Sequence, residues 1–240
     1  MIYIKNFFGG LCNNLLQLDN AFELFYRLKI DLNYLKINPK TRNPKYRSRN
    51  VNFLFKELEK HYIHPKTDRI FAGCRPIKYI RGKPLPKINL QKKYLLAPIL
   101  NQNADYTYNY LNILEKQKII KEKYKDIADD NTITFHIRRG DYFHHKGYKK
   151  FILSDKYILS AIHKYSKNRI LILTNPESID YVKNLTGNLK NIIYAYDLNL
   201  NLDEEFLLGS VTNYVITNPR SSFSRLLKSF NVKYIKDKKK

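Results

Sequence analysis

The chain has 240 residues, of which 43% are hydrophobic and 14% aromatic, so it can bury a sizeable core and is not a disordered tail. Its 44 Lys and Arg residues against 21 Asp and Glu residues give a net charge of +23, which favours polyanionic partners or reflects a solvated lysine surface. Two cysteines, Cys12 and Cys74, exclude a disulfide framework and a cysteine-based zinc site, and no stretch approaches the ~20 apolar residues that span a bilayer.

The amino-terminal segment predicts a strand, a glycine turn and a helix. Residues 2–5 read as a strand and not as a signal peptide, so we expect a cytoplasmic protein, with at most a peripheral contact with an anionic membrane surface. Gly9 and Gly10 form the turn. A helix is expected from about 12 to 29, because apolar residues recur at spacings of four and three: Leu11, Leu15, Leu18, Phe22 and Phe25. A strand, a glycine turn and a helix bring backbone N–H groups toward an anion.

Three ionisable residues of this helix, Asp19, Glu23 and Arg27, are spaced four apart. Such a row is typical of solvated salt bridges on a helix surface. The alternative is that the two carboxylates line a cleft.

Between this helix and residue 131 the pattern is less regular. Recurring prolines between His64 and Pro98 interrupt any longer period, and the polar, basic stretch 38–50 predicts a loop. The other elements expected here are strands at 32–37, 70–72 and 94–97, helices at 51–62 and 105–125, and a polar connection at 126–131.

Residues 132–137 alternate polar and apolar side chains, which predicts a half-buried strand. Its two faces carry different residues: Ile133, Phe135 and Ile137 on one, and Thr134, His136 and Arg138 on the other.

Charged side chains collect where this strand ends. Arg138, Arg139 and Asp141 surround Gly140, which lets the chain turn sharply. Ligands of open α/β sheets bind at that edge. Arginine there suits a phosphate, because its planar fork donates two hydrogen bonds and keeps its charge. The alternative is a surface ion pair between the arginines and Asp141.

After this strand, helices and strands alternate regularly. Helices are expected at 155–165, from 176 or 177 to 185, at 202–210 and at 222–230, and strands at 169–173, 191–194 and 214–217; Ser154 is a plausible N-cap. This alternation predicts an α/β fold with a mostly parallel sheet that is covered on both faces.

The segment His136-Ile137-Arg138-Arg139-Gly140-Asp141-Tyr142 matches, position for position, the His-x-Arg-Arg-x-Asp-Tyr motif of the α-1,2-fucosyltransferases. Residues 9–17 resemble the opening of the same family, Gly-Gly-Leu-Gly-Asn-Gln-Leu-Phe-Gln, with Cys12, Asn14 and Leu16 as departures. Residues 207–224 resemble its late signature, a short helix, an apolar strand and Asn-Ser-Ser-Phe-Ser-Trp-Trp.

In this third segment, Ser221-Ser222-Phe223-Ser224 keeps the core of the signature. Asn218 is separated from it by Pro219-Arg220, and Arg225-Leu226 replaces the two tryptophans. Serines at a helix start can offer hydroxyl and N–H groups to a phosphate, although ordinary N-capping explains them as well. The chain therefore resembles a compact or divergent member of the family.

The resemblance implies the GT-B architecture, in which two Rossmann-like domains with mostly parallel sheets face each other across a cleft. Residues 1–128 would form the acceptor-side domain and residues 129–240 the domain that binds the donor nucleotide. The implied reaction is the inverting transfer of fucose from GDP-β-L-fucose to a hydroxyl of a glycan acceptor, most simply the 2-hydroxyl of a galactoside, in glycan biosynthesis.

The resemblance also implies roles for individual residues. Arg138 would bind the donor diphosphate, Arg139 would contact the donor or support local structure, and His136 and Asp141 would orient the loop between strand and helix. The other residues expected at the donor are Gly9, Gly10, Asn13, Ser221, Ser222 and Ser224.

Neither a cofactor nor a metal ion is expected. The sequence contains no Asp-x-Asp pair, and fixed cations with N–H dipoles can stabilise a departing nucleotide without a metal. The general base that would take the acceptor proton stays open between Asp19, Glu23, Asp141 and His144.

Two alternatives remain at this stage. One is the same fold transferring another nucleotide sugar, or an inactive relative. The other is a nucleic-acid-binding protein, argued from the charge alone, which would show a basic face with exposed aromatic residues and no nucleotide site.

Overall fold

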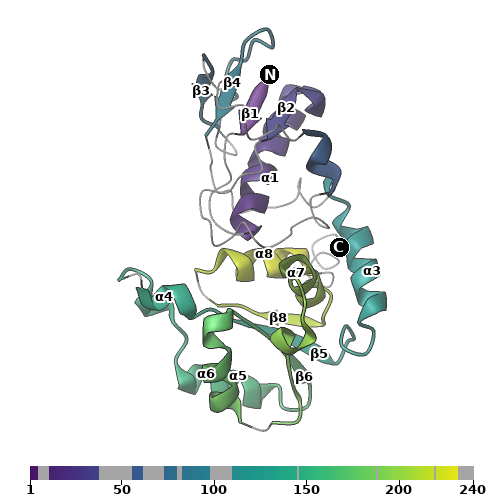
Figure 1. Ribbon diagram of the computed structural model, residues 1–240, viewed down its shortest axis with the longest axis vertical. Coiled ribbons are helices and arrows are strands. Elements are labelled where there is room, and N and C mark those ends of the chain that lie inside the picture. Colours follow the sequence, from purple (N-terminus) through teal and green to yellow (C-terminus); the bar gives the residue numbers. More distant parts are fainter. Residues whose placement is uncertain are drawn as a thin grey trace. The chain divides into compact units, whose positions relative to one another are not determined.

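The structure is a computed structural model that describes residues 1–4, 11–37, 56–61, 73–79, 83–97, 110–144, 146–187, 189–218 and 220–231, with the backbone alone for Glu59 and Asp141. The chain divides into two compact units, Met1–Ile113 and Leu114–Lys240 (Figure 1). Helix α3 (Ile113–Lys123) therefore belongs almost entirely to the second unit, whereas the boundary expected from the sequence lay between residues 128 and 129. The reason is that Gln117 of α3 donates to Ser210 Oγ (2.8 Å) and to the carbonyl of Phe230 (2.6 Å), both in the second unit.

The first unit contains a parallel sheet of four strands in the order β2-β1-β4-β3. The strands are β1 (Ile2–Ile4), β2 (Leu35–Ile37), β3 (Arg75–Ile77) and β4 (Tyr94–Leu96), accompanied by helix α1 (Leu11–Leu28) and the 3₁₀ segments η1 (Leu32–Tyr34) and η3 (Lys56–His61). The strand expected over 32–37 begins only at Leu35, because the Asp31 side chain accepts the N–H of Asn33 (2.8 Å) and caps a 3₁₀ turn. Strand β3 was not predicted, and the predicted strand at 70–72 and loop at 38–50 lie outside the described residues.

The second unit contains a parallel sheet in the order β7-β6-β5-β8. Its strands are β5 (Thr132–Ile137), β6 (Arg169–Thr174), β7 (Ile192–Tyr194) and β8 (Tyr214–Ile216). Its helices after α3 are α4 (Gly140–His144), α5 (Asp155–Lys164), α6 (Ile179–Thr186), α7 (Leu202–Ser210) and α8 (Ser222–Phe230), with 3₁₀ segments η5 (Lys149–Phe151), η6 (Pro176–Ser178) and η7 (Ala195–Leu198). The bounds predicted for β5, α7 and α8 are confirmed, as is the Ser154 N-cap, which accepts the N–H of Tyr157 (3.2 Å).

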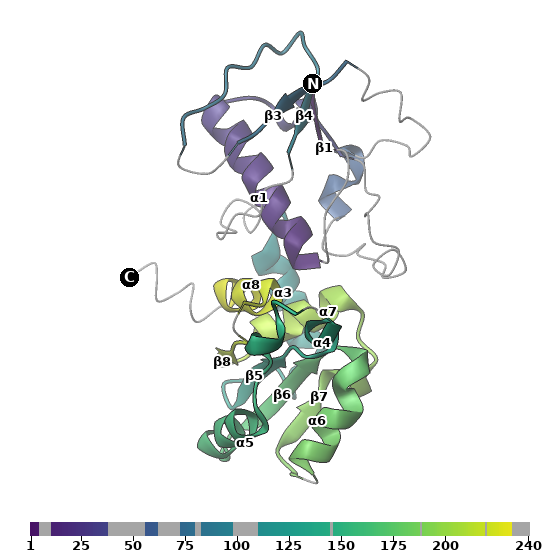
Figure 2. The same ribbon diagram turned by 90° about the vertical axis from the view of Figure 1, so that its left-hand side faces the viewer.

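Strand β5 is buried on both faces, so the prediction of a half-buried strand was wrong. Its apolar face packs on residues of α5 and α6 such as Ile158 and Val182, and its polar face lies under α7 and α8, which cover the other side of the sheet (Figures 1 and 2). On that polar face Thr134 Oγ1 donates to the Gly209 carbonyl (3.1 Å), and a Cβ at Gly209 would lie 2.8 Å from Leu173. A parallel sheet with helices on both faces buries both faces of its central strands. The alternation of polar and apolar residues in β5 therefore distinguishes two helix-covered faces, and neither face is exposed to solvent.

The strand order defines where a ligand can approach this sheet. From β5 the chain proceeds to β6 and β7 on one side and then returns to β8 on the other side of β5. The switch point is therefore between β5 and β8. Since all four strands are parallel, their carboxyl ends, with Arg138 after β5 and Thr217 after β8, lie at one edge.

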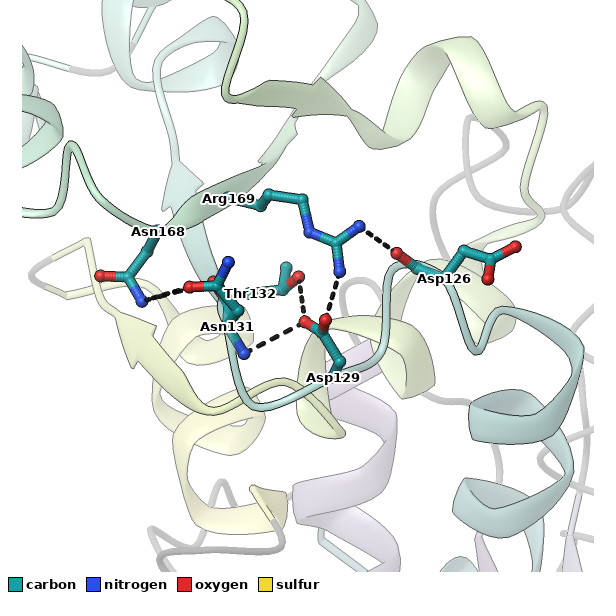
Figure 3. Close-up of polar contacts among 6 residues, drawn as sticks. All are labelled: Asp126, Asp129, Asn131, Thr132, Asn168 and Arg169. Carbon is teal, nitrogen blue, oxygen red and sulfur yellow. Dashed lines mark hydrogen bonds and ion pairs between the residues drawn. The ribbon is translucent and has the colours of Figure 1, made fainter.

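The opposite, amino-terminal edge is held by a polar network (Figure 3). The Arg169 guanidinium bonds both the Asp129 carboxylate and the Asp126 carbonyl, while Asp129 Oδ1 accepts from Thr132 Oγ1 (2.8 Å) and from the N–H of Asn131 (3.1 Å). The network ties the chain that enters β5 to the start of β6.

The structure also bears on the cysteines, on membrane-spanning helices and on metal ligands. Cys12 is buried and Cys74 partly exposed, and neither forms a disulfide. None of the described helices combines the length and apolar character that a membrane crossing requires. Within the described ranges, no three His, Cys, Asp or Glu side chains gather as metal ligands would, and metal independence stays a prediction.

Candidate active site

His136, at the end of β5, is buried with 4% of its surface exposed. Its Nδ1 lies 2.6 Å from Ser224 Oγ on α8, and that hydroxyl oxygen accepts the N–H of Asn218 (2.8 Å). Burial, together with the positive charge of Arg138, lowers the pKa of His136 to about 3. With a pKa this low the imidazole is neutral at pH 7, and its contact with Ser224 joins α8 to β5.

Asn218 ties the two loops at the switch point together. Its Nδ2 donates to the carbonyl of Arg138 (3.2 Å), and its own carbonyl accepts the N–H of Ser221 (3.3 Å). Its Oδ1 is buried without a hydrogen-bond partner among the described residues. Arg138 is half-buried, and this hydrogen bond goes to its backbone carbonyl. The bond therefore positions Arg138 through its main chain and does not involve its guanidinium.

The side chain of Arg139 makes several local contacts. Its Nη1 donates to the Leu153 carbonyl (3.1 Å) and lies 3.8 Å from Oδ1 of Asp155. Its guanidinium carbon lies 3.7 Å from the centre of the Tyr181 ring. Only 11% of its side chain is exposed. Burial, with a hydrogen bond to Asp155, raises the pKa of Tyr181 to about 12, so this ring stays protonated beneath the guanidinium.

Gly140 does not have a positive φ, and its place at the start of α4 is crowded by a neighbouring side chain. Asn175, just after β6, accepts the N–H groups of Gly140 (3.2 Å) and Arg139 (3.4 Å) through Oδ1. A Cβ at Gly140 would lie 2.0 Å from Asn175 Nδ2. Sequence reasoning missed Asn175, because only the fold brings it to the motif. The next residue, Asp141, lies in α4, and its side chain is outside the described atoms.

The serines at the start of α8 divide into structural and accessible groups. Ser221 is the N-cap and accepts the N–H of Ser224 (3.3 Å), and Ser224 is buried against His136. Ser222, the first helical residue, is partly exposed. The first N–H groups of a helix have no acceptor within it, so those of Ser222 and Phe223 suit an anion.

Of the three residues expected at the donor in the first unit, Asn13 lies among the described residues. Gly9 and Gly10 lie outside the described residues. Asn13 is in the first turn of α1, partly buried, with its carbonyl accepting from Gln17 Nε2 (2.9 Å). Cys12, which replaces a family glycine, is 3% exposed, so its side chain packs into the core.

The candidates for a general base differ in exposure. Asp19 is 0% exposed and Glu23 is 4% exposed, so the expected solvated row on α1 was wrong, although Glu23 lies 3.9 Å from Arg27. A carboxylate without exposed surface cannot reach an acceptor hydroxyl in this conformation. His144, at the end of α4, is exposed.

A doubly wound parallel sheet with arginine and a helix start at its switch point is typical of nucleotide-binding α/β proteins. The sequence profile of glycosyl transferase family 11 matches residues 20–228, so the chain belongs to this family. Membership makes the protein a glycosyltransferase and supports the fucosyltransferase class that the motif resemblance implied. No curated protein matches the sequence significantly.

Two crystal structures of POFUT1 resemble the whole chain. The complex of POFUT1 with GDP has 10% sequence identity and a TM-score of 0.51, with 95% of this chain and 93% of that chain covered. The apo form has 9% identity and a TM-score of 0.50, with coverages of 95% and 94%. At such low identity the likeness shows the fold, and the α/β class with two Rossmann-like units is confirmed.

Proposed function

We propose that the protein transfers fucose from GDP-β-L-fucose, with inversion, to a hydroxyl of a glycan acceptor, most simply the 2-hydroxyl of a galactoside. The observation that carries this proposal is the position of Arg138. It lies in the complete His-x-Arg-Arg-x-Asp-Tyr motif, at the switch point, and Asn218 ties its carbonyl to the loop that starts α8. Family membership and the fold shared with a GDP complex of POFUT1 support the choice of donor.

The chemistry needs a fixed positive environment for a departing diphosphate. In the transfer, the bond between the sugar carbon C1 and the β-phosphate oxygen breaks and its electron pair leaves with GDP. The acceptor oxygen bonds C1 from the opposite face, and its proton passes to a general base. Arg138 and the N–H groups that begin α8 can stabilise the charge that grows on GDP. The contact between His136 and Ser224 fixes the start of α8 against the end of β5.

Other residues complete the proposal. Ser222 is the serine best exposed for a phosphate, while Ser221 and Ser224 act through the helix start that they cap. Gly9, Gly10 and Asn13 would contact the donor from the first unit, and Asp141 would orient the loop around Arg138. The nucleotide sugar and the glycan are the partners, no cofactor takes part, and the protein acts in the cytoplasm or at an anionic membrane surface.

A thermal-shift panel tests the donor. GDP and GDP-fucose should raise the melting temperature, since binding only the native state adds about 2.7 kcal/mol at a hundredfold excess over Kd. UDP, UDP-galactose and short RNA should leave it unchanged. Equal shifts with UDP, larger shifts with GDP-mannose than with GDP-fucose, or a shift with RNA alone would overturn the assignment of donor and sugar.

A further inference from the structure

Arg220, in the turn between β8 and α8, has a backbone conformation that arginine rarely adopts. Its φ is +63°, in the left-handed region that glycine or asparagine enters at lower cost. It immediately precedes Ser221, the N-cap of α8. A strained residue other than glycine beside a candidate site suggests that its side chain is needed there.

The side chain of Arg220 reaches toward the loop that follows the other strand of the switch point. Its guanidinium carbon lies 5.3 Å from the centre of the Phe151 ring, at the end of η5. Arg220 is exposed, and within the described part of the chain it forms no ion pair with a carboxylate. Arg139, by contrast, is engaged by the Leu153 carbonyl and the Tyr181 ring. The charge of Arg220 is therefore available to an anionic ligand.

Arg138 and Arg220 thus lie in the two loops that Asn218 joins. Asn218 bonds the Arg138 carbonyl (3.2 Å) and the Ser221 N–H (3.3 Å), which fixes the Arg220 turn against the end of β5. In the sequence, Arg220 is one of the two residues between Asn218 and the Ser-Ser-Phe-Ser core. It is therefore not one of the motif positions that implied the donor site.

We propose that Arg220 is a second catalytic cation, which binds the β-phosphate of the sugar nucleotide opposite Arg138. The inference rests on the proposed function. When the C1–O bond breaks, its electron pair remains on the β-phosphate oxygen, and the Arg220 guanidinium donates hydrogen bonds to that phosphate as its charge grows. The cation–π contact with Phe151 holds the guanidinium near this position before the donor arrives.

The test compares GDP with GMP, which lacks the β-phosphate. Arg220→Gly removes the guanidinium and relieves the backbone strain, so its melting temperature without nucleotide should stay close to that of the wild type. Isothermal titration should show that this variant binds GDP roughly tenfold to a hundredfold more weakly, while its affinity for GMP changes less than twofold. Hydrolysis of GDP-fucose should slow by at least the same factor.

Lys167→Gly is the matched control, because it removes one charge from an exposed turn at the amino-terminal edge of the same sheet. It should bind GDP and GMP as the wild type does. Arg220→Lys keeps the charge and the strain and should recover part of the GDP affinity. Equal losses for GDP and GMP would show a merely structural role, and wild-type affinities in Arg220→Gly would exclude any role. A wild-type protein that binds neither nucleotide would overturn the proposed function and this inference with it.

Discussion

At the scale of single residues, the two arginines of the motif are held in different ways. The carbonyl of Arg138 is bonded by Asn218, whereas the guanidinium of Arg139 is bonded to the Leu153 carbonyl and stacked on Tyr181. The different roles that we propose for these adjacent arginines rest on this contrast, since Arg138 is bonded through its backbone and Arg139 through its side chain.

Replacing Arg138 with lysine tests the first role. Arg138→Lys keeps the charge but removes the planar, bidentate fork, so we expect GDP-fucose turnover to fall about a hundredfold or more. The fold should hold, since the bond from Asn218 goes to the backbone. Steady-state kinetics with circular dichroism measures both effects. A folded variant with near-normal turnover would mean that this motif is not the donor site.

The comparison variant Arg139→Lys should behave differently. It loses the stacking on Tyr181 and the geometry of the bond to Leu153, so we expect a loss of about 1–2 kcal/mol in the free energy of unfolding. Turnover per folded molecule should fall less than for Arg138→Lys. Urea unfolding and the same kinetic assay decide this. A larger loss of turnover in Arg139→Lys than in Arg138→Lys would mean that Arg139, and not Arg138, binds the donor.

Gly140 and Asn175 form a second testable pair. Gly140→Ala would place a Cβ 2.0 Å from Asn175 Nδ2, so the asparagine must move and lose its bonds to the N–H groups of Gly140 and Arg139. We expect a destabilisation of about 1–3 kcal/mol. In an Asn175→Ala background the cost of Gly140→Ala should be at least about 1 kcal/mol smaller, measured as a double-mutant cycle. Additive effects would show that the contact with Asn175 is not the reason why a side chain at position 140 destabilises the fold.

At the scale of elements, the sequence predicted the regular half of the chain well. The strand at 132–137 and the helices at 202–210 and 222–230 follow from local periodicity, which needs no tertiary information. Burial of both faces of β5, the link between Gly140 and Asn175 and the link between Arg138 and Asn218 could not be predicted, because partners 35 and 80 residues apart meet only in the fold. In the first unit, strand β3 has three residues with Pro76 at its centre, so it carried no periodic signal.

The network at the amino-terminal edge predicts a pH dependence of stability. Desolvation acts to raise the pKa of Asp129, but the hydrogen bond from Thr132 and the charge of Arg169 outweigh it and lower that pKa. A lowered folded-state pKa stabilises the fold above the unfolded pKa, near 4, and that stabilisation is lost as the pH falls through the folded value. Because the Asp129 side chain is 40% exposed, the contribution is small, at most about 1 kcal/mol.

Asp129→Asn should therefore lower the free energy of unfolding at pH 7 by up to about 1 kcal/mol and have a smaller effect below about pH 4. Asp126→Asn is the control, since Arg169 bonds the carbonyl of Asp126 and not its carboxylate (Figure 3). Urea titrations of the three proteins at pH 3.5 and pH 7 make the measurement. A difference that does not depend on pH would mean that the ion pair is not its source.

At the scale of the whole molecule, the proposed reaction needs compensation for the charge of a departing nucleoside diphosphate. The sequence offers no Asp-x-Asp pair to hold a divalent cation, while its net charge is +23 and its motif supplies two adjacent arginines. Arg138 beside the amino end of α8 can provide that compensation through fixed dipoles and charge. We therefore expect transfer from GDP-fucose to continue at an unchanged rate in excess EDTA. The assay is product formation after dialysis against the chelator, with a glycosyltransferase that requires manganese as the positive control. Loss of transfer that manganese or magnesium restores would show that protein cations alone do not stabilise the leaving GDP, and the role of Arg138 would then be secondary to that of a metal.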